Sequence, residues 1–108
     1  MVRMNNDNEV ITFEVDNDAN IHNTSLKIRN LKATYDQLVG LFGEPKQIKN
    51  DHARVQWVIT FSDGKLLTVY DWNDERRIYD VTEWNVGGHD TMSAYRISDI
   101  LAGRPIEI

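Results

Sequence analysis

Residues Val55 to Gly88 carry the clearest strand pattern of the chain and read VQWVITF, SDG, KLLTVYDW, NDER and RIYDVTEWNVGG in succession. Apolar and polar residues alternate along its long pieces with the period of two that β-strands produce. The Asp63-Gly64 pair predicts a hairpin with a type I′ turn, which needs positive φ at both central residues. The stretch is therefore predicted to form three antiparallel strands, at 55–61, 65–72 and 78–86, with a second turn at 73–76 and an end at Gly87-Gly88.

Both faces of this predicted sheet carry apolar side chains. In the first strand, Trp57 and Val58 point to opposite faces. In the second strand, Val69 and Trp72 do the same. One face should bury against helices, and the other is available to meet a partner subunit. We therefore expect a homo-oligomer.

Strand patterns also precede this stretch. Residues 9–16 (EVITFEVD) alternate with a period of two and predict a strand with one buried face. The Asn and Asp residues at 17–20 predict a turn, because their side chains hydrogen-bond the local backbone. A less regular strand at 21–28 would then make the N-terminal part a hairpin.

A helical period follows at residues 31–42 (LKATYDQLVGLF). Thr34 can cap a helix that starts there, with Gln37 completing a capping box, and Leu31 then lies just outside the helix. Gly43 and the proline two residues later end it. This pattern predicts one helix before the central sheet.

A second helix is predicted at roughly 91–102, capped by Asp90 or Thr91 and ended by Gly103. The chain as a whole is predicted to be a single α+β domain over residues 1–108, with loose ends. Its expected architecture is an antiparallel β-sheet of four or five strands packed by two helices, in the order β-(β)-α-β-β-β-α.

Composition excludes several classes of function. The chain has 108 residues, a formal net charge of −5 and an isoelectric point near 5.0. Binding of duplex nucleic acid depends on Lys and Arg, so an acidic chain does not fit it. The absence of cysteine excludes disulfides, thiol catalysis and Cys-ligated zinc. No apolar run reaches the roughly 20 residues of a membrane span, and the start MVRMNNDNEV lacks a signal-peptide core, so we expect a cytoplasmic protein without membrane contact.

The segments TSL, TYDQLVGLFGEP, WVITFSDGKLLTVYDW and EWNVGGH follow one another between residues 23 and 91. In this order they resemble a family of small bacteriophage-encoded proteins with a TY–L–FGEP helix end, a W-I-F-DG hairpin, a Y-D/N-W strand end and a W-x-(I/V)-G-G-H close. The chain departs from that pattern in its longer N-terminal strand region and in the Leu66-Leu67 pair. The positions that carry the resemblance are Thr34, Tyr35, Phe42, Gly43, Glu44, Pro45, Trp57, Phe61, Asp63, Gly64, Tyr70, Trp72, Trp84, Gly87, Gly88 and His89.

The resemblance implies a phage origin, and therefore the cytoplasm of a host cell. Small early phage proteins of this size often counter host defence, so it also implies an inhibitor of bacterial antiviral defence. Two mechanisms are typical of that class. One sequesters a nucleotide second messenger, as anti-Thoeris and anti-CBASS sponges do, and the other binds a defence protein directly, as anti-CRISPR proteins do.

The closing segment WNVGGHDT favours a nucleotide ligand. A Gly87-Gly88 turn leading into a helix would expose backbone N–H groups at the positive end of the helix dipole, where anions bind. Aromatic residues of the sheet would stack on a base, and arginines would bind phosphate. The predicted ligand-binding residues are Arg54, Tyr70, Trp72, Trp84, Gly87, Gly88, His89 and Arg104.

Each of these features also has an ordinary structural interpretation. A double glycine between a strand and a helix is most often only a turn. Trp57 and Trp84 fit a small aromatic core better than they fit a stacking platform, because buried aromatic residues dominate small cores. The carboxylate of Asp90 would compete with a ligand for the same N–H groups.

Enzymatic patterns are missing from the sequence. His52 and His89 each have an adjacent aspartate, but side chains of neighbouring residues usually point apart and form no dyad. Together with His22 they lack the helical or HxH spacing that would arrange metal ligands. The sequence has no P-loop, GxGxxG or GxSxG motif. We therefore predict a non-catalytic nucleotide sponge without metal or cofactor.

Two alternatives stay open. Acidic residues of the N-terminal part would suit a nucleic-acid mimic that occupies a basic groove on a defence protein, because charge complementarity raises association rates. A structural or assembly role in the phage is the other alternative. The acidic residues in question are Asp7, Glu9, Glu14, Asp16 and Asp18.

Overall fold

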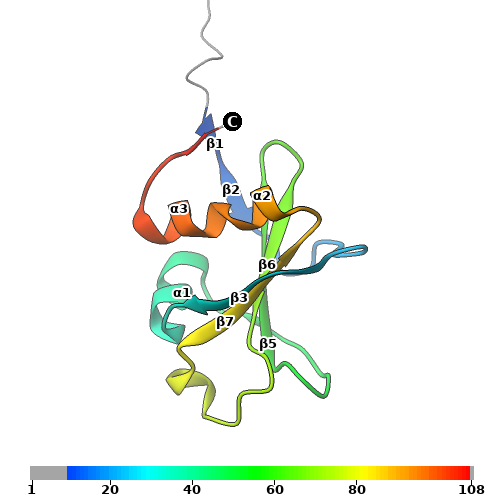
Figure 1. Cartoon of the computed structure of the whole chain (residues 1–108), viewed down its shortest axis with the longest axis vertical. Helices are drawn as coiled ribbons and strands as arrows, with labels where there is room; N and C mark the ends of the chain where they lie inside the picture. Colours follow the sequence, from blue (N-terminus) through cyan, green and yellow to red (C-terminus); the bar gives the residue numbers. More distant parts are fainter. Residues whose placement is uncertain (1–9, 108) are drawn as a thin grey trace, which may run out of the picture.

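The computed structural model describes residues 10–107, whose central element is an open antiparallel sheet in the order β2-β5-β6-β7-β3 (Figure 1). The short β4 also pairs with β5, and a separate ladder joins β1 to β8. The predicted α+β class, an antiparallel sheet packed by helices, is confirmed. The strands are β1 (Val10–Ile11), β2 (Phe13–Val15), β3 (Ser25–Lys32), β4 (Lys46–Gln47), β5 (Val55–Phe61), β6 (Leu66–Tyr70), β7 (Glu83–Gly88) and β8 (Ile106–Glu107).

The helices are α1 (Tyr35–Phe42), α2 (Thr91–Ala94) and α3 (Arg96–Ala102), with one 3₁₀ turn, η2 (Ile78–Asp80). The predicted capping box is confirmed, because the Thr34 hydroxyl accepts the Gln37 N–H at 3.1 Å and the Gln37 side chain accepts the Thr34 N–H at 2.8 Å. The helix therefore starts after Thr34, and Leu31 belongs to β3. The predicted final helix is divided at Tyr95 into α2 and α3.

The β5–β6 hairpin is confirmed, but its predicted turn type is wrong. Gly64 has φ of 88°, whereas Asp63 is not among the residues with positive φ. The Gly64 N–H donates to the Phe61 carbonyl at 2.9 Å, and the Phe61 N–H donates to the Lys65 carbonyl at 2.9 Å. The loop therefore has three residues, 62–64, with glycine at the one position that requires the left-handed region.

The third strand starts later and ends later than predicted. Residues 78–80 form η2, because half-buried Ile78 and buried Val81 follow a three-residue period and Arg77 pairs with Asp80 at 3.0 Å. Gly87-Gly88 is not a turn beyond the strand but forms its last two residues. Both glycines belong to β7, where Gly87 pairs with Thr68 of β6 and with Leu26 of β3.

The N-terminal strands also differ from expectation. The predicted strand at 9–16 is interrupted at Thr12, because β1 pairs with β8 while β2 pairs with β5, and residue 9 lies outside the described residues. The predicted strand at 21–28 is displaced to β3, 25–32. The turn before it extends to Thr24 through Asn23, whose φ is 67°.

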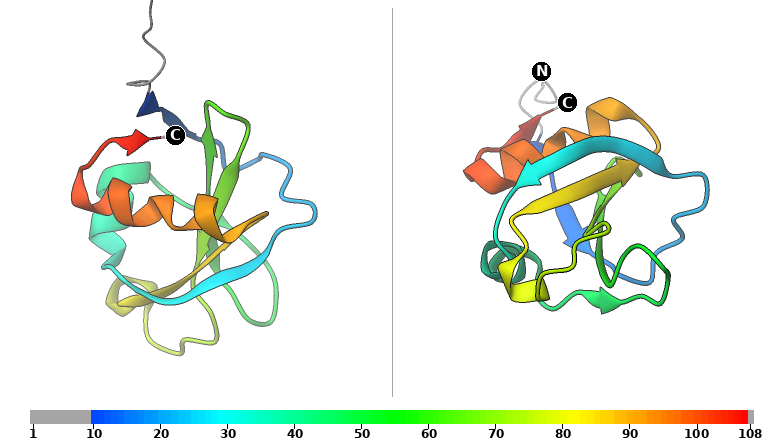
Figure 2. Two further views of the ribbon diagram at one scale, coloured as in Figure 1. Left: turned by 45° about the horizontal axis from the view of Figure 1, so that its top comes forward. Right: turned by 60° about the horizontal axis from the view of Figure 1, so that its bottom comes forward.

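The hydrophobic core lies between one face of the sheet and helices α1 and α3, which both lie on the same side in Figure 2. Trp57 and Trp84 are almost completely buried there, with ring centroids 5.5 Å apart in an edge-to-face contact. Tyr35 of α1 packs on both indoles. Core positions therefore account for two of the three tryptophans.

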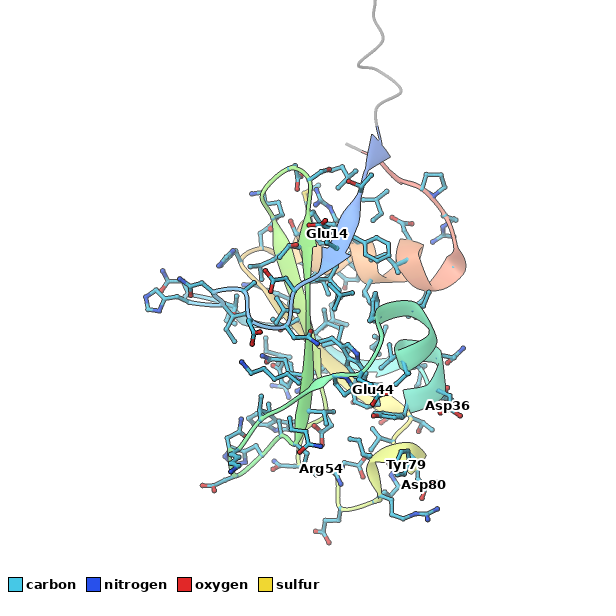
Figure 3. The ribbon with its side chains drawn as sticks, turned by 180° about the vertical axis from the view of Figure 1, so that it is seen from behind. Glu14, Asp36, Glu44, Arg54, Tyr79 and Asp80 are labelled. Atoms are coloured by element: carbon cyan, nitrogen blue, oxygen red, sulfur yellow. The ribbon has the colours of Figure 1, made fainter. Side chains whose placement is uncertain are left out.

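The opposite face of the sheet is covered in part by the chain's own loops (Figures 2 and 3). Val58 is fully buried on this face, and its N–H donates to the Asn17 side chain at 2.8 Å. The loops after β2 and α1 thus cover part of the sheet face that we expected to be available to a partner subunit. Among the described residues, no helix is long and apolar enough to cross a membrane.

Candidate ligand-binding groove around Trp72

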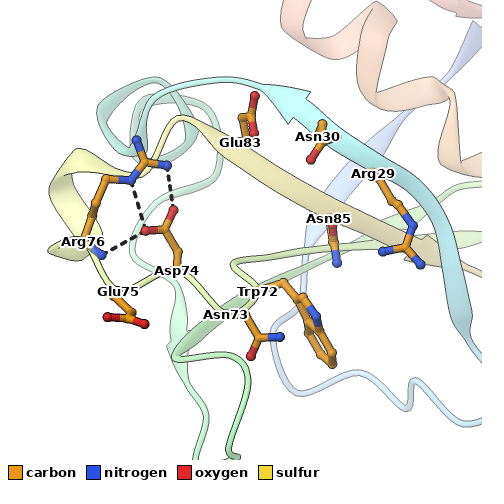
Figure 4. Close-up of a pocket in the computed structure, with 9 residues that line it drawn as sticks. All are labelled: Arg29, Asn30, Trp72, Asn73, Asp74, Glu75, Arg76, Glu83 and Asn85. Carbon is orange, nitrogen blue, oxygen red and sulfur yellow. Dashed lines mark hydrogen bonds and ion pairs between the residues drawn. The ribbon is translucent and has the colours of Figure 1, made fainter.

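Three adjoining hollows lie on the loop-covered face of the sheet, and they meet at the segment that follows β6. The first has a volume of about 350 Å³, the second about 200 Å³ and the third about 360 Å³. We call them together the Trp72 groove. The first hollow is lined by Arg29, Asn30, Trp72, Asn73, Asp74, Glu75, Arg76, Glu83 and Asn85 (Figure 4).

A buried carboxylate holds the segment in place at the end of β6. Asp71 is fully buried and accepts hydrogen bonds from the Arg54 N–H and Nε at 2.8 Å each, and from the Val55 N–H at 3.1 Å. Asn73 adopts a left-handed conformation with φ of 49°, and its N–H donates to the His52 carbonyl at 2.7 Å. Residues 71–73 are therefore tied to the start of β5.

Trp72 is the exposed aromatic residue of the groove. Its side chain is 44% exposed, and its ring stacks on His52 with centroids 4.7 Å apart and planes 27° apart. Tyr70 meets the indole edge-to-face at 6.1 Å. The indole is thus held from two directions while much of its surface stays open to solvent.

Irregular pairing in β3 brings Arg29 to the groove. The register between β3 and β7 shifts between Leu26 and Ile28, and again between Ile28 and Leu31. Asn30, inside the second shift, has φ of 59°. Such bulges redirect side chains, and here Arg29 and Asn30 line the first hollow. Among the described residues, Arg29 forms no ion pair.

Tyr70 and Asn85 form the floor beside Trp72. They are cross-strand partners in β6 and β7, and Asn85 is only 8% exposed although it is polar. Burial raises the pKa of the Tyr70 phenol above its usual value, with smaller opposing effects from Asn85 and Arg29. The phenol therefore stays protonated at neutral pH and can donate a hydrogen bond.

The remaining charges of the first hollow are largely paired. Arg76 binds Asp74 through its side chain at 2.7 and 3.0 Å, and this hydrogen bonding holds the pKa of the Asp74 carboxyl below its usual value. Glu83 pairs with Lys32. Glu75 has no ion-pair partner among residues 10–107.

The structure brings four of the predicted ligand-binding residues to the groove. Tyr70 and Trp72 lie at its centre, and Gly87 lines the second hollow. Arg54 lines the third hollow, where its guanidinium also donates to the Arg76 carbonyl at 2.7 Å.

The other four predicted residues lie elsewhere. Trp84 is 1% exposed, and its Nε1 donates to the Ala33 carbonyl at 2.8 Å inside the core. His89 contacts the His22 carbonyl through Nε2 at 2.9 Å. Arg104 pairs with Asp99 at 3.2 Å, beside an apolar hollow on the helix side.

Gly88 is the fourth of the predicted residues that lie outside the groove, and its position shows that the predicted anion-binding turn is wrong. It is buried in β7 between Ser25 and Leu67, so its backbone belongs to the sheet. The helix that follows, α2, has only four residues. Tyr79, an aromatic residue that the sequence placed in the sheet, lies instead on η2 and packs on Tyr35 with ring centroids 5.3 Å apart (Figure 3).

Sequence reasoning did not find Arg29, Asn30 and Asn85. Asn85 left only the signal of ordinary alternation, because it stands between Trp84 and Val86 and so points to the opposite face of the strand. Arg29 and Asn30 left none, since their placement depends on the bulges of β3. Among the described residues, no group of three or more His, Cys, Asp or Glu side chains is arranged to hold a metal ion.

Comparisons with known proteins add no relative. No protein-family model matches the chain, and searches of curated proteins and of solved structures returned no match.

Proposed function

We propose that this protein is a non-catalytic binder that holds a small nucleotide-like ligand in the Trp72 groove. In the setting that the phage resemblance implies, it would sequester a nucleotide signal of antiviral defence in the host cytoplasm. The observation that carries the proposal is Trp72 itself, a 44% exposed indole that lines two of the three hollows and precedes Asn73, which lines the third.

The groove supplies the two kinds of contact that a base needs. Stacking of a base on an aromatic side chain contributes about 1–3 kcal/mol and tolerates any base. The amides of Asn30 and Asn85 offer both donors and acceptors for a base edge, and Asn73, whose Oδ1 already contacts His52 Nδ1 at 3.0 Å, offers its NH₂ group. Such polar groups in a preformed hollow give orientation, while the aromatic surface gives affinity.

A direct inhibitor of a defence protein is the competing proposal. The observation in its favour is that Glu14 and Asp16 are exposed near the sheet edge formed by β2. Asp18 pairs with Lys46 at 2.8 Å, which reduces the negative charge of that cluster. Asp7 and Glu9 lie outside the described residues.

The homo-oligomer also stays a proposal. Exposed Trp72 offers part of a contact surface, and a shared groove would enclose a ligand more fully than a single copy does. Light scattering coupled to size-exclusion chromatography measures the mass directly. A monomer at all concentrations would remove this proposal without affecting ligand binding.

Calorimetric titration of purified protein with nucleosides, cyclic nucleotides, nucleoside triphosphates and ADP-ribose tests the ligand proposal. We expect at least one of these compounds to bind, and Trp72→Ala to weaken that binding about tenfold or more through lost stacking. Tyr95→Ala is the matched control, because Tyr95 is 55% exposed and lines none of the three hollows. The proposal fails if nothing in the panel binds, or if both variants bind like the unmodified protein.

A further inference from the structure

The charges that line the first hollow nearly cancel. Arg29 and Arg76 contribute the positive charge, whereas Asp74, Glu75 and Glu83 contribute negative charge. Lys32 lies beside Glu83 and offsets it. A ligand with several negative charges would therefore meet carboxylates as well as arginines in this hollow.

Only one of the arginines around the groove is unengaged. Arg76 holds Asp74 by two side-chain hydrogen bonds, and Arg54 holds buried Asp71 and the Arg76 carbonyl. Arg29 makes no ion pair within the described part of the chain. Figure 4 shows it on the side of the hollow away from the Asp74–Arg76 pair, near Trp72 and Asn85. One guanidinium is thus available to one anionic group.

The volume of the first hollow also limits the size of the ligand. The first hollow, at about 350 Å³, lies at the lower end of the roughly 300–1,000 Å³ that small-molecule sites occupy. It holds one indole platform, so it offers a stacking position to one base. The volume of the first hollow and its one stacking position therefore fit a single base-and-sugar unit.

We infer, resting on the proposed function, that the first hollow of the Trp72 groove selects a base-bearing ligand with at most one negative charge, a nucleoside or a cyclic mononucleotide, and discriminates against polyphosphates. Trp72 stacks on the base, the asparagine amides meet its edge, and Arg29 binds the single phosphodiester. Glu75 opposes any further phosphate.

Calorimetric titrations at one fixed ionic strength, with adenosine, guanosine, their 3′,5′-cyclic monophosphates and the matching triphosphates, test this selection. We expect the nucleoside or cyclic nucleotide to bind at least tenfold more tightly than the triphosphate of the same base. Arg29→Gln should weaken cyclic-nucleotide binding about tenfold while changing nucleoside binding less than twofold. Equal losses for both ligands would overturn the role of Arg29.

Glu75→Gln tests the discrimination itself. It should raise triphosphate affinity about threefold or more and leave nucleoside affinity unchanged, because it removes like charge from the groove. Glu14→Gln is the matched control: it makes the same chemical change on β2, at an exposed position that lines none of the hollows (Figure 3). An equal gain in both variants would show only a change in overall charge and would contradict the inference.

The same titrations separate the two proposals. If a triphosphate binds most tightly and the binding needs Trp72, the charge selection is wrong while the ligand-binding function stands. If neither the charged nor the uncharged compounds bind a protein whose thermal unfolding is intact, both proposals fail.

Discussion

On the helix-covered face of the sheet, Trp57 and Trp84 are buried, and each Nε1 donates to a backbone carbonyl at 2.8 Å, of Gly43 and of Ala33 respectively. On the opposite face, Trp72 is 44% exposed and rests on His52 and Tyr70. The same residue type thus serves packing on one face and remains available to a ligand on the other. Burial with a satisfied N–H therefore marks a structural tryptophan, and exposure above a polar hollow marks a candidate for binding.

Truncation of the buried and of the exposed tryptophan should have very different costs. Trp84→Ala should lower the free energy of unfolding by about 3–5 kcal/mol, because it leaves a large cavity and an unpaired Ala33 carbonyl in the core. Trp72→Ala should lower it by about 1 kcal/mol or less, since its side chain is largely outside the core. Urea titrations with unchanged m-values measure both. A similar cost for the two variants would show that Trp72 is a structural residue.

A variant of Asp71 tests how much the hydrogen bonds of this buried carboxylate stabilise the groove side of the fold. Asp71→Asn should lower the free energy of unfolding by about 2 kcal/mol, because an amide cannot accept from both the Arg54 Nε and the backbone N–H groups. The control is Asp80→Asn, which removes an exposed ion pair with Arg77 and should cost about 0.5 kcal/mol or less. Thermal unfolding of both variants under one buffer gives the answer. Equal shifts of the unfolding temperature would mean that the buried Asp71 carboxylate stabilises the fold no more than the exposed Asp80 carboxylate does.

Gly87 tests how closely the strands approach on the groove face. A Cβ at Gly87 would lie 2.7 Å from Thr68 Oγ1 and 3.2 Å from the Ser25 carbonyl oxygen. Gly87→Ala should therefore lower the free energy of unfolding by about 1–3 kcal/mol. Gly40→Ala, at an exposed position of helix α1 with open space around the new methyl, should raise it by up to about 1 kcal/mol.

A second variant identifies the cause of the Gly87 effect. Thr68→Ala removes Oγ1, so the double variant Gly87→Ala/Thr68→Ala should recover part of the loss, as a double-mutant cycle in urea measures. Strict additivity of the two single effects would contradict the clash with Thr68.

The helix-covered face was more open to prediction than the groove. Periodicity predicted the strand that carries Trp57 and the helix that carries Tyr35, and local chemistry predicted the Thr34 cap, because these signals depend on neighbours in sequence. The groove depends on Arg29, Trp72 and Asn85, which approach only through bulges and strand pairing. The local sequence also suggested a turn at Gly87, because it does not show the strands that pair on both sides of this residue. Position 87 requires glycine because a Cβ there would clash with Thr68, and Thr68 is too distant in sequence for any local pattern to show this.

The smallest expected effect lies where α3 meets the β5–β6 hairpin, on a polar contact of the helix-covered side. Arg96 binds Asp63 at 2.7 and 3.0 Å, and this hydrogen bonding holds the pKa of the Asp63 carboxyl below its usual 3.8. A lowered pKa in the folded state means that the stabilisation is present above the unfolded value and is lost as pH falls through the folded value. Asp63→Asn should therefore cost about 0.5–1 kcal/mol at pH 7, and the cost should shrink as the pH is lowered below about 4. Urea midpoints of the two proteins across this range measure it. A pH-independent difference would assign the effect to the turn and not to the ion pair, and would leave the aromatic core as the main support of that side of the sheet.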